Sequence, residues 1–119
     1  MPDYCVIIPA YNAARTLTEA LQSVCAQRPA PAEVIVVDDG SSDDTAAIAA
    51  GFGGPVRVIG QANAGPGAAT MAGIAVARAP VLAFLDADDL WLAGKMAAQM
   101  AQLQRLGPDG LVFARMRQF

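Results

Sequence analysis

Three carboxylates fall within four positions of the sequence, at Asp86, Asp88 and Asp89, directly after the apolar run of residues 81–85. Like charges a few ångströms apart repel, and each raises the cost of ionising the next. Carboxylate oxygens are also the ligands that Mg²⁺ and Mn²⁺ prefer in proteins. The pattern therefore predicts a site for a hard divalent cation, which would hold phosphate oxygens as well.

The role of each carboxylate depends on the path of the chain after the apolar run. Asp86 and Asp88 share a face only if a strand continues through them, so Asp89 remains a candidate ligand. The alternative is that Asp88 or Asp89 only caps the following helix, because acidic residues are common at helix starts.

Two further polar clusters follow apolar runs, at residues 9–12 (PAYN) and 38–42 (DDGSS). Asp39 could accept a hydrogen bond from a base N–H or a ribose hydroxyl, although Asp, Gly and Ser also suit a tight turn. Tyr11 could lie beside a planar ligand, but a turn with a packed tyrosine explains this cluster equally well. The glycines around residue 66 lack the third glycine of the dinucleotide fingerprint, so no NAD site is predicted.

Strand-like and helix-like patterns alternate along the chain. The expected strands are residues 4–8 (ended by Pro9), 33–37, 56–59, 81–85 and 111–114. The expected helices are residues 17–25 after a capping box at 16–19, 42–50 capped by Ser42, 66–78 with proline in the first turn, and 92–103 stopped by Gly107-Pro108;. This order predicts an α/β protein with a Rossmann-like, doubly wound, mainly parallel sheet.

Ligands of such sheets bind beyond the carboxyl ends of the strands. The three polar clusters, at residues 9–12, 38–42 and 86–89, all follow predicted strands. The sequence therefore predicts that they share one crevice.

The composition narrows the classes of function. A length of 119 residues predicts a single domain, residues 1–119, and no apolar run approaches the roughly 18 to 20 residues of a membrane span;. The start has no basic segment typical of a secretory signal, so the cytoplasm is the expected location, with membrane association of a full-length protein left open. A net charge of −3 disfavours nucleic acid as a partner;. Cys5 and Cys25 lack metal-ligand spacing and are expected to be buried without a disulfide or zinc.

Four segments, taken in order and spacing, resemble the family 2 glycosyltransferases with the GT-A fold. They are VIIPAYNAARTLTEALQSVCAQ (6–27), EVIVVDDGSSDDT (33–45), NAGPGAATMAGIAVA (63–77) and VLAFLDADDLW (81–91). The resemblance extends from Tyr4 to about Leu106 and implies the nucleotide-sugar-binding N-terminal part of a truncated GT-A fold.

The resemblance also implies roles for individual residues and a divalent cofactor, Mn²⁺ or Mg²⁺. Asp88 is the implied metal ligand, with Asp89 as a second candidate. The implied nucleotide contacts are Pro9, Ala10, Tyr11, Asn12, Asp39, Asn63, Gly65, Asp86 and Ala87, with Asp39 reading the base. The family often carries Ala-Arg-Asn where this chain has Ala69-Thr70-Met71, so a basic contact is missing there.

The reaction implied is transfer of a sugar from a nucleotide diphosphate, with a UDP-sugar as the expected donor, to a hydroxyl of a saccharide or lipid. A metal would neutralise the charge that develops on the leaving diphosphate, and a general base would deprotonate the acceptor. Family members usually carry that base well after the acidic motif, so we expect it, and the acceptor-binding part, beyond Phe119. An uncovered edge at residues 111–113 then predicts self-association.

Two alternatives belong to other classes of function. A non-catalytic nucleotide-binding fragment would share every motif above. A receiver-type signalling domain also clusters aspartates around Mg²⁺, but its acidic pair follows the first strand, where this chain has residues 9–12. Its required lysine follows a late strand, whereas Lys95, the only lysine, falls in the last predicted helix.

Overall fold

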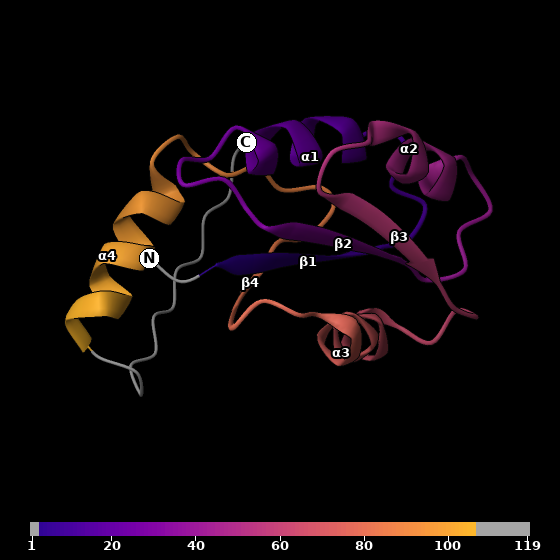
Figure 1. The fold of residues 1–119 in the computed structure, drawn as a ribbon. Coiled ribbons are helices and arrows are strands. Elements are labelled where there is room, and N and C mark those ends of the chain that lie inside the picture. Colours follow the sequence, from indigo (N-terminus) through magenta and orange to yellow (C-terminus); the bar gives the residue numbers. More distant parts are fainter. Residues whose placement is uncertain (1–2, 107–119) are drawn as a thin grey trace.

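The computed structural model describes residues 3–106, in which strands and helices alternate strictly (Figure 1). The strands are β1 (Tyr4–Ala10), β2 (Glu33–Asp38), β3 (Val56–Gly60) and β4 (Val81–Phe84). The helices are α1 (Leu17–Cys25), α2 (Thr45–Phe52), α3 (Pro66–Val76) and α4 (Lys95–Leu106). All strand pairs are parallel, in the order β3-β2-β1-β4, so the predicted α/β class is confirmed.

The strand order reverses beside β1. Ile7 lies opposite Ile35 of β2 on one side and opposite Phe84 of β4 on the other. The chain winds outward from β1 to β3 and then returns to add β4 across β1. The carboxyl ends of β1 and β4 therefore flank a topological switch point, where open α/β sheets bind their ligands.

Helices cover both faces of the sheet, with α1 and α2 on one face and α3 on the other (Figure 1). Val6 and Ile8 of β1 pack in one apolar cluster with Leu17 and Leu21 of α1. The alternate residues of β1 and β2 pack with Ala69 of α3 in a second cluster. Both strands are apolar throughout because both of their faces are buried. No helix among residues 3–106 is long and apolar enough to cross a membrane.

Pro9 does not end β1, contrary to the prediction, but lies within it opposite Val37. The carbonyl of Ile7 faces β4, where it accepts a hydrogen bond of 3.1 Å from the Leu85 amide. Pro9, two residues later, faces the same way at a level beyond the last β4 pair, Ile7 with Phe84. Because proline has no N–H to donate, it cannot extend the ladder to β4, and the pairing of β1 with β4 ends at Ile7 and Phe84;.

Helices α1 and α3 begin where predicted, at Leu17 and Pro66, whereas several other helix features differ from the prediction. The capping box at residues 16–19 is wrong, because the Thr16 side chain makes no capping bond to α1. Helix α2 begins at Thr45 after Asp44 rather than after Ser42, and α4 begins at Lys95 rather than near residue 92. Helix α3 ends at Val76, two residues before the predicted end. The predicted stop at 107–108 and strand at 111–114 lie outside the described residues.

Both cysteines are free thiols. Cys5 is buried in β1, and Cys25 at the end of α1 is half-buried. Burial raises the pKa of Cys5 to about 12 and also raises the pKa of Cys25. The two thiols therefore behave as small core side chains rather than as nucleophiles at neutral pH.

Candidate functional site

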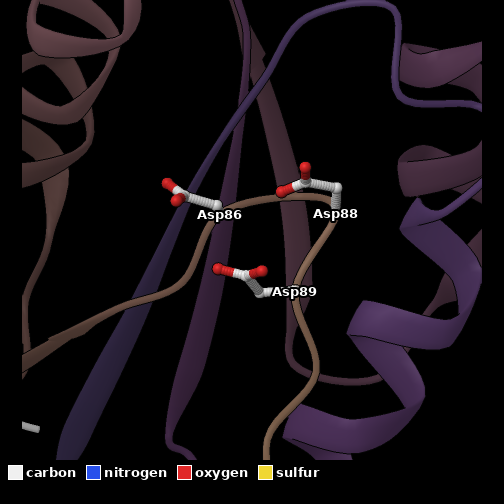
Figure 2. Close-up of side chains that lie close together, drawn as sticks. All are labelled: Asp86, Asp88 and Asp89. Atoms are coloured by element: carbon white, nitrogen blue, oxygen red, sulfur yellow. The ribbon is translucent and has the colours of Figure 1, made fainter. Parts of the chain in front are cut away.

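The acidic residues after β4 lie on one tight turn, which we call the acidic turn (residues 86–89). The Asp89 amide donates a hydrogen bond of 3.0 Å to the Asp86 carbonyl, which closes the turn. One carboxylate oxygen from each of Asp86, Asp88 and Asp89 lies within 4.8 Å of the others. Figure 2 shows the Asp88 carboxylate extended toward Asp86 across the turn. The three predicted residues therefore come together.

The turn places Asp89 differently from the other two carboxylates. Asp86 and Asp88 are exposed, whereas Asp89 is 7% exposed. The helix-cap alternative is wrong, because α4 begins only at Lys95, well after the turn. An all-oxygen set of this kind suits Mn²⁺ or Mg²⁺ by its donor chemistry.

A cavity of about 500 Å³ lies between the loop that follows β1 and the acidic turn. It occupies the switch point of the sheet, and its volume is in the usual range for small-ligand sites. Tyr11 is 56% exposed there, so the packed-tyrosine alternative is wrong. The lining residues are Pro9, Tyr11, Asn12, Ala13, Arg15, Thr16, Asp86, Ala87 and Asp88.

Asn12 fixes the shape of the wall that follows β1. Its backbone has a φ of +48°, which asparagine tolerates better than most residues;. Its amide donates to the Ser41 hydroxyl at 2.8 Å, and its side-chain oxygen accepts from the Ser42 amide at 2.8 Å. The Ala13 amide donates to the Thr45 hydroxyl at 2.9 Å. The loop after β1 is therefore held by the loop after β2.

Asp39 lies in a different environment, buried with 3% exposure and outside the lining of this cavity. Its carboxylate accepts hydrogen bonds from the Gln61 side chain (2.8 Å), the Ala64 amide (2.8 Å), the Asn63 side chain (3.2 Å) and the Gly65 amide (2.9 Å). We call these five residues the Asp39 cluster. The bond from Gln61, followed by those from the two amides, lowers the pKa of Asp39 below its ordinary value.

The predicted site residues thus form two groups. Most of those after β1 and β4 line the cavity, while Asn63 and Gly65 both donate to Asp39 outside it. Ala10 is 2% exposed and Asp89 7%, and neither lines the cavity.

Sequence reasoning missed Arg15, Thr16 and Gln61. Arg15 is exposed and lines the cavity beside the acidic turn. The sequence did hold a signal for Arg15, because it places this cation in the loop after the first strand, at the same sheet edge as the acidic motif. Met71, where the family pattern has a polar residue, is 64% exposed on α3.

Comparison with known families decides the assignment. The model of "Glycosyl transferase family 2" matches residues 5–119. The chain belongs to this family. The receiver-type alternative is therefore wrong, and the predicted recognition is confirmed.

The curated relatives that the chain matches are longer than the chain. The succinoglycan biosynthesis protein ExoU of Rhizobium meliloti is 41% identical over 104 residues, which are 84% of this chain and 30% of that protein. The succinoglycan biosynthesis protein ExoO of the same organism is 45% identical over 91 residues, which are 75% of this chain and 26% of that protein. The chain thus spans less than a third of the length of these relatives.

Solved glycosyltransferase structures share the fold. S. aureus TarS in complex with UDP-GlcNAc has a TM-score of 0.79 at 29% identity, over 87% of this chain and 31% of that chain. The mannosyltransferase PcManGT from Pyrobaculum calidifontis, in complex with GDP-Man and Mn²⁺, has a TM-score of 0.70 at 26% identity, over 92% and 35%. The predicted GT-A type fold is confirmed over this partial length.

Proposed function

We propose that the intact protein transfers a sugar from a nucleotide-diphospho-sugar donor to an acceptor hydroxyl, and that residues 3–106 bind the donor. The observation that supports this most directly is the acidic turn, whose three carboxylates lie beside a cavity at the switch point. Membership of glycosyl transferase family 2 gives the reaction class. Relatives in complex with UDP-GlcNAc, and with GDP-Man and Mn²⁺, give the class of donor.

Asp88 and, second to it, Asp89 would hold the divalent cation, Mn²⁺ or Mg²⁺. When bound, such a cation neutralises charge on a leaving diphosphate. Asp88 lines the cavity directly, whereas Asp89 is buried against the turn. Asp86 and Ala87, which precede them on the same turn, would contact the ribose.

The nucleotide would lie along the loop after β1, with Pro9, Ala10, Tyr11 and Asn12 at its border. Asp39 would read the base, and Asn63 and Gly65 would support it through the hydrogen bonds that they already donate. Because four donors already occupy the Asp39 carboxylate, a base N–H would have to replace one of them. Of the two side-chain donors, Gln61 is the replaceable one, since Asn63 also donates to the Asp39 carbonyl at 2.9 Å and is held there by that second bond.

Arg15 would supply the cation that Thr70 and Met71 do not. Its side chain lines the cavity together with Asp88, so it lies on the side where a metal-bound diphosphate would be. Arg15→Gln should weaken binding of UDP much more than binding of uridine, because only the diphosphate carries charge. Arg28→Gln, an exposed arginine away from the cavity lining, is the matched control. Equal losses for UDP and uridine would exclude the phosphate role.

Calorimetry with UDP tests the metal role. UDP and Mn²⁺ should each raise the affinity of the other by the same factor, commonly about 5- to 150-fold. Asp88→Asn should reduce this factor more than Asp86→Asn or Asp89→Asn, because Asp88 is the first proposed metal ligand and lines the cavity, whereas Asp86 would contact the ribose and Asp89 lies outside the lining. Equal UDP affinity in EDTA and in excess Mn²⁺ would remove the metal from the proposal.

A non-catalytic nucleotide-binding protein is the competing function. We propose that the general base and the acceptor-binding part lie in a region that corresponds to the part of the relatives not matched by this chain. Sugar release from UDP-sugars and GDP-sugars by the intact protein with Mn²⁺ separates the two functions. Nucleotide binding without sugar release or transfer to any acceptor would favour the non-catalytic one. The cytoplasmic location and the self-association stay predictions.

A further inference from the structure

The segment from the acidic turn to α4 runs alongside α1 and is hydrogen-bonded to it at three levels. The Thr16 hydroxyl donates to the Ala87 carbonyl at 2.9 Å. Farther along, the Trp91 amide donates to the Ser23 hydroxyl at 3.1 Å. Side chains in α1 and just before it therefore hold the main chain of this segment, which lies about 70 positions later in the sequence.

Gln27 makes the last of these connections. Its side-chain nitrogen donates to the Leu92 carbonyl at 2.9 Å, and its oxygen accepts from the Met96 amide at 3.1 Å. Gln27 is 2% exposed, so both ends of its amide are used in a dry environment. Lys95 is also buried, with its ammonium 4.3 Å from the centre of the Trp91 ring. The far end of the segment is thus fixed to the end of α1.

Thr16 acts on the acidic turn itself. Ala87 lies between Asp86 and Asp88, so a bond to its carbonyl restrains the peptide that connects two of the three carboxylates. Thr16 precedes the first residue of α1, yet its side chain makes no capping bond to the helix. Its strong hydrogen bond goes to the turn instead, and its second contact, to the Ala13 carbonyl, is longer at 3.4 Å.

Three carboxylates within 4.8 Å of one another repel when ionised, and the bond from Thr16 to the Ala87 carbonyl restrains the main chain between two of them;. We propose that Thr16 is a positioning residue that holds the acidic turn in its metal-binding shape, with Ser23 and Gln27 anchoring the segment that follows. This inference rests on the metal role in the proposed function. It assigns to the hydroxyl of Thr16 an effect on metal affinity that is exerted through the Ala87 carbonyl.

Titration with Mn²⁺, monitored by electron paramagnetic resonance, tests the inference. No nucleotide is added, so a contact between Thr16 and a nucleotide cannot affect the result. Thr16→Val keeps the side-chain shape and removes the hydroxyl. It should weaken Mn²⁺ binding about 10-fold, which is the smaller of the effects seen when residues that hydrogen-bond to metal ligands are changed. Thr16→Ser should restore the affinity. Thr18→Val, the same change at an exposed position of α1, should leave it unchanged.

Ser23→Ala tests whether anchoring of the segment beyond the turn also contributes to metal affinity. Ser23 is bonded to Trp91, which lies beyond the acidic turn, so its hydroxyl cannot contact a cation held by the turn. Weaker Mn²⁺ binding in Ser23→Ala, with the melting temperature recorded for each variant, supports positioning by α1. A loss confined to Thr16→Val, with Ser23→Ala at wild-type affinity, would overturn the anchoring role of Ser23 and leave the bond from Thr16 to the Ala87 carbonyl as the restraint on the turn.

Different results would refute the metal role and the positioning role of Thr16. If the unmodified protein binds no Mn²⁺, the metal role in the proposed function is wrong, and the positioning role falls with it. If the unmodified protein binds Mn²⁺ and Thr16→Val binds it equally well, only the positioning role is wrong.

Discussion

Asp39 and Asp88 both follow parallel strands that end at the same edge of the sheet, but the chain surrounds them differently. Asp39 is 3% exposed and accepts four hydrogen bonds from residues 61–65. Asp88 is exposed, lines the cavity, and lies within 4.8 Å of two other carboxylates. One charge is stabilised by donors of the protein, and the other is surrounded by like charge.

The two carboxylates are thus held in position for a ligand in two different ways. The Asp39 cluster links β2 to the start of α3, so its hydrogen bonds stabilise the fold before any nucleotide arrives. The clustered carboxylates of the acidic turn repel one another, and the Thr16 hydroxyl, just before α1, holds the main chain between two of them;. Substitutions in the first group should therefore cost stability, whereas those in the second should cost metal affinity.

The largest expected difference is in thermal stability. Asp39→Ala removes the buried acceptor that four donors of residues 61–65 share, which should lower the melting temperature by about 5 to 10 °C;. Asp88→Ala should leave it within about 2 °C of the original or raise it, because the change relieves repulsion. Thermal unfolding without ligands measures both. Equal melting temperatures for the two variants would contradict the comparison.

Gly73 tests whether the Asp39 cluster depends on the placement of α3. A Cβ at this position would lie 2.6 Å from a methyl group of Ile7 and 3.3 Å from one of Val37. Gly73→Ala should displace α3 and cost about 1 to 3 kcal/mol of unfolding free energy in urea. Gly65, at the start of the same helix, donates to Asp39, so UDP binding should weaken while Mn²⁺ binding stays unchanged.

Gly51→Ala is the matched control for this substitution. Gly51 lies in α2, and an added Cβ would meet nothing within 4 Å. Better helix propensity should raise the unfolding free energy by about 0.5 to 1 kcal/mol. A gain in Gly73→Ala of the same size would mean that α3 shifts without cost.

Much of this architecture could be predicted from the sequence, because its signals are local and strong. The buried strands β1 and β2 are apolar throughout, and the polar clusters mark their ends. The starts of α2 and α4 and the role of Thr16 were not predicted correctly, and for Thr16 a long-range contact is the reason. Thr16 looks like a helix cap in the sequence but bonds to Ala87, 71 positions away.

The site was predicted in its residue types better than in its grouping. Asp86, Asp88 and Asp89 converge as expected, since one short turn brings them together. The Asp39 cluster could not be anticipated, because the four donors come from the segment after β3 and no sequence pattern marks Gln61 as a partner. The contribution of Arg15 to the cavity likewise depends on how the loop after β1 folds over it.

Lowering the pH should reduce the stability that the Asp39 carboxylate contributes. The folded-state pKa of Asp39 lies below its ordinary value of 3.8, so its contribution to stability is complete above that pH. This contribution should be lost as the pH falls from about 4 through the folded-state pKa. Asp39→Asn should show a shallower loss of unfolding free energy between about pH 5 and about pH 2. Glu33 and Asp43, whose pKa values are also lowered, remain in both proteins as a common background.

The smallest expected effect concerns Gln61 and decides how Asp39 becomes available to a base. Gln61→Met keeps the length of the side chain and removes the donor that lies 2.8 Å from the carboxylate. If a base N–H replaces Gln61, removing this competitor should raise UDP affinity about 5-fold, the worth of one net hydrogen bond. Calorimetry with UDP measures the change, and Mn²⁺ affinity without nucleotide is the control. Weaker UDP binding would show instead that Gln61 contacts the nucleotide itself, and Asp39 would then act through the cluster that it holds together.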